Sequence, residues 1–157
     1  NAFISNFGVL ANATYIDSNS TFNLQGPITV AFVPATGALG PLSNVTVTNS
    51  LSNVSKWSYN ATLYYDDGKF SARAMLSYRS RYHEGASGTG NLLEGYGATT
   101  NLDASVRYKV TDFMELSLEG NNLLDTYRYR FTDYTADRNY ENNHFGRTIL
   151  FGARFKM

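Results

Sequence analysis

Cysteine is absent from this chain of 157 residues, and only 3 residues are proline. The lack of cysteine excludes disulfide frameworks, thiolate metal sites and cysteine nucleophiles. Charged residues make up 17% of the sequence, against roughly 25% in soluble domains. The formal net charge is zero, which removes the electrostatic case for a nucleic-acid partner.

Long apolar runs are missing too. No stretch of 18 or more apolar residues occurs, and this excludes a membrane-spanning helix. The amino end has neither the basic start nor the small-residue cleavage site of an export signal. If the chain reaches an outer membrane, we expect that signal upstream of residue 1. The mean hydropathy of -0.31 decides little, because a barrel wall with one lipid face and one wet face also averages to a polar value.

Apolar and polar residues alternate with the period of two that is typical of β-strands. About six strands are predicted, at residues 7–15, 57–66, 70–82, 102–110, 114–119 with a continuation toward 130, and 145–157. Strands of roughly 9 to 13 residues are long enough to cross a tilted bilayer. The polar face of residues 70–82 carries several arginines, which do not suit the core of a soluble protein.

Short turns at residues 66–69 and 111–112 alternate with long loops at residues 18–56, 83–98 and about 132–144. Aromatic residues, mainly 12 Tyr and 10 Phe, mark both ends of the apolar faces, as in the girdles of membrane barrels. The predicted fold is therefore all-β: an antiparallel transmembrane β-barrel segment with short periplasmic turns and long extracellular loops. The first long loop is apolar enough to fold back as an extra hairpin or a lid.

The predicted strands are too few to close a barrel alone. Single-chain bacterial barrels begin at about 8 strands, and lipid does not tolerate an open sheet edge, because unpaired backbone groups there have no water to bond. We therefore expect the chain to be part of a larger barrel.

Two groups of side chains are candidate functional residues. One group is predicted to line the barrel interior and to touch whatever fills it; it comprises Arg73, Arg107, Lys109, Glu115 and Glu119. The other is predicted to contact a ligand at the outer side, because aromatic rings beside amide and guanidinium donors suit sugars and anionic chelates. It comprises Arg79, Arg81, Tyr82, Tyr134, Arg138, Tyr140, Asn142 and His144.

No catalytic residues, metal site or cofactor are predicted. Glu115 and Glu119 lie four residues apart on one strand, about 13 Å by strand rise, which is too far for either glycosidase geometry. His83 and His144 are the only histidines, and no recognised ligand spacing links them to other residues.

Several segments in order along the chain resemble the C-terminal barrel of TonB-dependent outer-membrane receptors. The segments are residues 13–18, 54–65 (VSKWSYNATLYY), 70–73, 78–82, 102–105, 118–125 (LEGNNLLD) and 146–152 (GRTILFG). The resemblance spans nearly the whole chain, apart from the long loops. One departure is the final residue, Met157, where the family usually ends on an aromatic residue.

This resemblance implies an active-transport receptor in the outer membrane of a Gram-negative bacterium. Such a receptor has a barrel of about 22 strands, an N-terminal plug domain inside it, and uptake powered by the inner-membrane TonB complex. Residues 1–157 would supply the last barrel strands and outer loops, and the plug would lie outside this chain. Implied partners are outer-membrane lipid, the rest of the barrel, the plug and the TonB complex; implied cargoes are siderophores, haem, cobalamin or oligosaccharides.

Two alternatives stay open at the level of the sequence. One is a small plug-less outer-membrane barrel with a structural or adhesive role. The other is a soluble carbohydrate-binding β-sandwich. The β-sandwich requires the apolar faces of the strands to pack against a second layer of protein, whereas either barrel requires them to face lipid.

Overall fold

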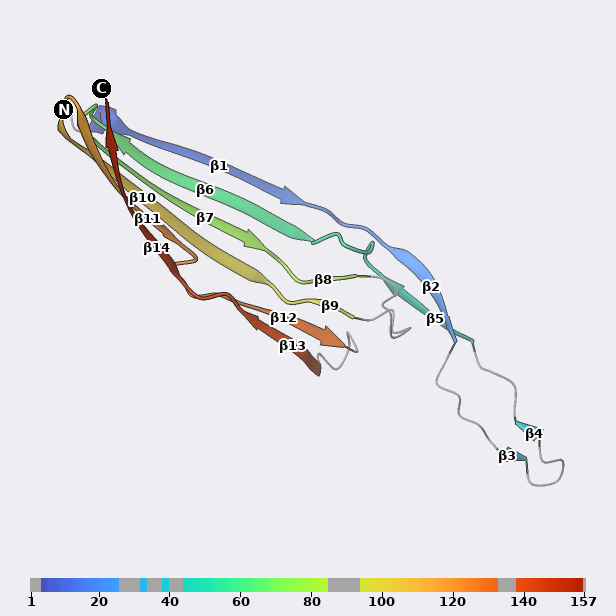
Figure 1. The fold of residues 1–157 in the computed structure, drawn as a ribbon. Helices are drawn as coiled ribbons and strands as arrows, with labels where there is room; N and C mark the ends of the chain where they lie inside the picture. Colours follow the sequence, from blue (N-terminus) through green and yellow to red (C-terminus); the bar gives the residue numbers. More distant parts are fainter. Residues whose placement is uncertain are drawn as a thin grey trace.

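A six-stranded antiparallel sheet with the order β1-β6-β7-β10-β11-β14 forms the main body of the computed structural model (Figure 1). The structure describes residues 4–25, 32–33, 38–39, 44–84, 94–132 and 138–156. The strands of the main sheet are β1 (Phe7–Tyr15), β6 (Trp57–Asp66), β7 (Phe70–Arg79), β10 (Thr99–Thr111), β11 (Met114–Asn121) and β14 (Thr148–Phe155). The six predicted strands are thus confirmed, and a short 3-10 helix, η1 (Ile4–Asn6), precedes them.

A second sheet continues four of these strands beyond the main sheet. It has the order β13-β12-β9-β8, with β8 (Tyr82–His83), β9 (Gly95–Tyr96), β12 (Tyr127–Thr132) and β13 (Arg138–His144). Along the chain, β8 follows β7, β9 precedes β10, β12 follows β11 and β13 precedes β14. The segments predicted as long loops therefore begin and end as paired strands.

The first long connection also contains strands. β2 (Ser20–Gln25) pairs with β5 (Asn44–Asn49), and β3 (Phe32–Val33) pairs with β4 (Ala38–Leu39). The predicted extra hairpin is present, but it does not fold back: β2 and β5 extend from β1 and β6 away from the main sheet (Figure 1).

Several predicted strand boundaries were wrong, and β10, predicted from residue 102, begins at Thr99. The strand predicted at 70–82 leaves the main sheet after Arg79, and the strand predicted to run from 114 toward 130 ends at Asn121. The cause of the second break is local: Asn122 and Asp125 have φ angles of 52° and 56°, in the left-handed region that interrupts a strand. The last strand begins at Thr148 rather than 145, just after Gly146 with φ of 73°.

Short turns gather at one end of the main sheet, where β1 begins and β14 ends (Figure 1). In the β6–β7 turn, Asp67 accepts hydrogen bonds from the backbone N–H groups of Phe70 (2.7 Å) and Lys69 (2.9 Å). These bonds favour the ionised carboxylate and lower the pKa of Asp67, the bond from Phe70 contributing most. The long connections lie at the opposite end, as the sequence predicts.

The strand register places most of the apolar side chains of the six strands on one face, although Leu10, Met75 and Leu150 lie on the other. One cross-strand row consists of Phe7, Tyr65, Ala72, Val106, Leu118 and Phe151. Val9, Leu118 and Phe151 keep 71%, 50% and 73% of their surface exposed. Among the described residues, the only buried hydrophobic side chains are Tyr82 and Phe131, both in the second sheet.

The apolar face of the main sheet is therefore not covered by protein in the described part of the chain. This is the arrangement of a barrel wall whose outer face meets lipid, and it does not fit a β-sandwich, in which a second sheet would bury the same side chains. The helical content of the described segments is limited to η1, and none of it is long and apolar enough to span a membrane.

Candidate functional site

The opposite face of the main sheet is polar and carries the five charged residues predicted to line the barrel. Arg73 lies across from Ser105, which in turn lies across from Glu119. Lys109 pairs in register with Glu115 near the short-turn end, and Arg107 lies between Ser71 and Ser117. The structure thus places all five on the face that would line the lumen of a closed barrel.

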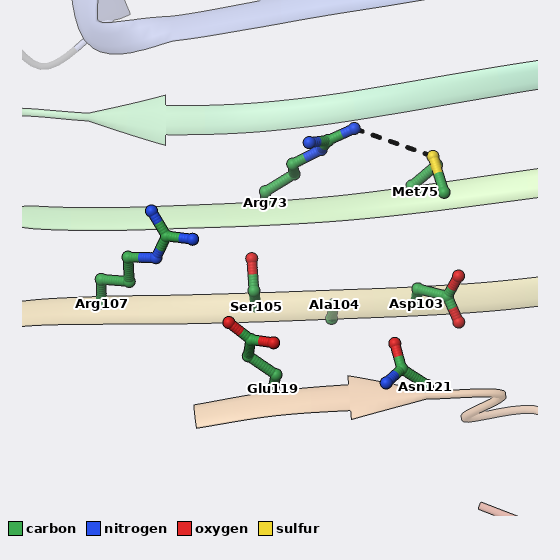
Figure 2. Close-up of a pocket in the computed structure, with 8 residues that line it drawn as sticks. All are labelled: Arg73, Met75, Asp103, Ala104, Ser105, Arg107, Glu119 and Asn121. Carbon is green, nitrogen blue, oxygen red and sulfur yellow. Dashed lines mark hydrogen bonds between the residues drawn. The ribbon is translucent and has the colours of Figure 1, made fainter. Parts of the chain in front are cut away.

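A hollow of about 270 Å³ on this face, here named the lumen hollow, is shown in Figure 2. Its lining residues are Arg73, Met75, Asp103, Ala104, Ser105, Arg107, Glu119 and Asn121. Two guanidinium groups and two carboxylates make the lining neutral in sum. Within the described residues, no ion pair joins these four charges, and Arg73 donates only a weak hydrogen bond to the sulfur of Met75 (3.8 Å).

A second hollow, of about 400 Å³, lies where the main sheet bends into the second sheet. It is named here the rim hollow. It is lined by Arg79, Tyr82, Tyr96, Gly97, Thr99, Asn101, Asn122, Thr126, Arg128 and Phe145. Since Thr99 and Asn101 lie across from Arg79 and Ser77 on the polar face, the rim hollow opens on the lumen side of the sheet.

Two arginine–tyrosine stacks form the wall of the rim hollow. The guanidinium of Arg79 lies 3.8 Å from the ring centroid of Tyr82, and that of Arg128 lies 4.0 Å from the centroid of Tyr96. The two rings are themselves 5.5 Å apart. Both arginines are exposed, and the cation–π contacts favour the positions of their guanidinium groups over the flat rings.

Arg79 is held further by hydrogen bonds to the segment before β6. Its Nε donates to the Ser55 hydroxyl oxygen (2.7 Å) and its Nη2 to the Asn53 carbonyl oxygen (2.8 Å). Arg128, by contrast, makes no hydrogen bond or ion pair within the described segments, although its charge acts at a distance on Glu141. The two cations therefore differ in how much of their donor capacity remains available.

Behind the rim hollow, Arg130 joins the strands of the second sheet. Its guanidinium contacts the carboxylates of Glu84 at 2.7 Å, Glu141 at 3.4 Å and Glu94 at 3.7 Å. Desolvation alone would lower the pKa of Arg130, but the hydrogen bond and charge of Glu84, together with the contributions of Tyr96 and Glu141, raise that pKa. Phe131, the next residue, is fully buried. These contacts give the hollow a rigid support.

The predicted ligand contacts are distributed over several places, and two of them, Arg79 and Tyr82, line the rim hollow. Arg81 lies instead over the ring of Phe131, 4.6 Å from its centroid. His144 contacts Asp125 through Nε2 at 2.8 Å and stacks on Tyr127.

The remaining predicted contacts lie on or near β13. Arg138 is exposed at the start of this strand, the backbone of Tyr140 belongs to it, and the Asn142 side chain accepts a hydrogen bond from Asn139 (3.1 Å). Tyr134 lies outside the described residues.

Sequence reasoning missed Tyr96, Arg128 and Phe145 as lining residues of the rim hollow. Residues 127–130 are Tyr-Arg-Tyr-Arg. This alternation predicts a strand with Arg128 and Arg130 on one face, and it could have identified Arg128 as a candidate. In the described part of the chain, no group of three or more His, Asp or Glu side chains is arranged to hold a metal ion.

Comparison with known proteins identifies one related family. The family model described as TonB dependent receptor-like, beta-barrel matches residues 3–123. This segment holds more than half of the chain and includes five strands of the main sheet, to which β14 is joined by its pairing with β11. Neither the curated proteins nor the solved structures contain a match.

Proposed function

This chain belongs to the TonB-dependent receptor-like β-barrel family, and we propose on that basis that it supplies the last wall strands and outer loops of a receptor that imports a scarce nutrient. Members of the family are outer-membrane transport receptors of Gram-negative bacteria rather than enzymes. In a full receptor of this kind, a plug domain occupies the barrel and the TonB complex supplies the energy.

The observation that carries the proposal is the division of the main sheet into two faces. Six consecutive antiparallel strands expose an unbroken apolar face on one side and hold arginines, lysine and carboxylates on the other. A sheet with lipid on one side and a hydrated interior on the other accounts for both faces.

The two edges of the sheet support the proposal that the chain is one part of a larger barrel. In the described residues, β1 pairs only with β6, and β14 pairs only with β11. An unpaired backbone group in lipid costs several kcal/mol. Both edge strands therefore need partners, and we assign these to the remaining strands of the same receptor.

The lumen hollow supports a contact with the plug. Arg73, Arg107, Asp103 and Glu119 line it without pairing with one another, so each can pair with a group of opposite charge inside the barrel. Lys109 and Glu115 lie closer to the short-turn end of the same face. The proposed cargo path then begins at the outer extensions and the rim hollow and continues past these residues without a covalent step.

The proposal is tested with the complete reading frame in its Gram-negative host. Deleting the gene and deleting tonB should cause the same growth defect on one nutrient, tested in turn as ferric siderophore, haem, cobalamin and oligosaccharide. The complete gene should restore growth, and a version lacking residues 1–157 should not. Normal use of every nutrient by the gene deletion strain, or restored growth without TonB, would contradict energised import and favour the plug-less barrel.

A further inference from the structure

The rim hollow differs from the lumen hollow in its charge. The lumen hollow combines Arg73 and Arg107 with two carboxylates, whereas the lining of the rim hollow contains two arginines and no Asp or Glu. The lining itself holds two cations and no countercharge, and the nearest carboxylates, those of Glu84, Glu94 and Glu141, lie behind it around Arg130. The rim hollow therefore presents positive charge to an anion, while the lumen hollow is neutral. The lumen hollow lies on the polar face of the main sheet, and the rim hollow lies where this sheet meets the second one, so the difference in charge depends on position along the polar face.

We propose that the rim hollow is an anion-binding subsite for the cargo, which presents a carboxylate, phosphate or ionised catechol oxygen to Arg79 and Arg128. The subsite deepens the proposed transport function and rests on it for the identification of its ligand as cargo. The shared chemistry of these ligands is an anionic oxygen group, which arginine binds through its planar fork of N–H donors.

The geometry supports this assignment because the cations are preorganised. A guanidinium has five N–H donors; Arg79 uses donors on Nε and Nη2 for Ser55 and Asn53, which leaves others for a ligand. Arg128 is positioned by its stack on Tyr96. A side chain that is already partly ordered loses less entropy when it binds an anion than a free one does.

The remaining lining favours a flat anionic group over a fully hydrated ion. Phe145 is 72% exposed at the edge of the rim hollow, and the Asn101 side chain adds an amide on the polar face. The volume of about 400 Å³ falls at the low end of ligand pockets. It accommodates one anionic group of a cargo, with the rest of the cargo extending into the lumen.

Soluble anions and lipid phosphates share this chemistry, but the position of the hollow separates them. The rim hollow opens on the polar face, opposite the apolar face that meets lipid. A soluble cargo anion can reach it from the barrel interior, whereas a lipid headgroup on the outer surface cannot.

The test measures binding of citrate, as a soluble tricarboxylate probe, to the complete receptor in detergent by equilibrium dialysis. Maltotriose serves as the neutral probe, and vesicles containing lipopolysaccharide serve as the lipid-phosphate probe. Citrate should bind to the wild-type receptor, and its affinity should fall as the salt concentration is raised. Its affinity for Arg128→Gln should be at least about tenfold lower. Arg128→Lys keeps the positive charge but loses the planar arrangement of N–H donors, so its affinity for citrate should lie between those of the wild type and Arg128→Gln.

Two further variants control for the fold and for general electrostatics. Tyr96→Leu keeps both cations but removes the platform under Arg128, and we expect it to weaken citrate binding severalfold. Lys56→Gln removes one positive charge outside the hollow, at an exposed residue that contacts Asp17, and should leave citrate affinity unchanged. Arg79→Gln is avoided as the primary variant because it would also release Ser55 and Asn53.

Three outcomes would overturn the subsite: no citrate binding, equal binding by the wild type and Arg128→Gln, or stronger binding of maltotriose or lipid phosphate that does not depend on Arg128. Uptake measured in parallel separates this proposal from the proposed function. If TonB-dependent uptake occurs and Arg128→Gln does not affect it, the subsite is contradicted and the transport function is not. If citrate binding requires Arg128 but no TonB-dependent uptake occurs, the transport function is contradicted and the anion site is not.

Discussion

A single arginine placed at two adjacent positions of β7 tests the assignment of the faces. Ala74 lies across from Leu63 and Ala104 on the apolar face, and Met75 lies across from Thr62 and Asp103 on the polar face. Both residues lie near the middle of a strand of 10 residues, so they share almost the same depth in the membrane. The two substitutions differ mainly in the side of the sheet that receives the charge.

The expected difference follows from the environment of each face. An arginine on the lipid face near the bilayer midplane costs about 2–4 kcal/mol, which corresponds to about a 30- to 700-fold change in the ratio of folded to unfolded protein. In Met75→Arg the new charge meets water, the opposite charge of Asp103 and the like charge of Arg73, and solvated charge pairs of this kind contribute about 0–1 kcal/mol each, with opposite signs here. We therefore expect Ala74→Arg to be strongly destabilising and Met75→Arg to be nearly neutral.

Urea titration of the complete receptor in lipid vesicles measures this difference, with the folded fraction determined from the mobility of unheated samples in gels. Ala74→Leu is the matched control, because it adds volume on the lipid face without adding charge, and it should retain the wild-type midpoint. Equal losses for the two arginine variants, or a larger loss for Met75→Arg, would show that the faces are assigned to the wrong environments.

Two further predictions concern glycine packing and pH. A Cβ at Gly95 would lie 2.1 Å from the backbone carbonyl oxygen of Tyr82. Gly95→Ala should therefore lower the free energy of unfolding by about 1–3 kcal/mol and speed hydrogen exchange in β8 and β9. Gly8→Ala is the control, because its Cβ would meet only the movable ring end of Tyr64, and it should change stability little. Hydrogen bonds from Asn143 and Arg130 lower the pKa of Glu141. The ionised Glu141 carboxylate therefore stabilises the β12–β13 hairpin fully at pH values above the ordinary glutamate pKa. This stabilisation is lost as the pH falls through the lowered pKa of Glu141. We expect protection from hydrogen exchange in this hairpin, measured relative to the intrinsic exchange rate at each pH, to fall at acid pH in the wild type but not in Glu141→Gln. Identical protection profiles for the two proteins would contradict this.

The candidate site shows where pattern reasoning reaches its limit. Arg79 and Tyr82 were predicted as ligand contacts because they lie at the outer end of a strand, and the structure places both in the rim hollow. Arg128 was missed because the strand predicted from residue 114 was carried on toward residue 130, although residues 121–124 (Asn-Asn-Leu-Leu) interrupt the alternation. That break depends on single φ angles and on hydrogen bonds from Asn122 to Asp103 and Gly146, which a period of two does not encode.

The amino-acid sequence by itself determined the six membrane strands, the faces on which their side chains lie and the side of the sheet that holds the short turns. It could do so because the alternation of side chains along a strand is a local property, carried by every second residue. Only the tertiary structure decided that Arg79, Tyr96 and Arg128 meet at one hollow. Their proximity arises from cross-strand register and from the bends between two sheets, which bring together residues far apart in the chain.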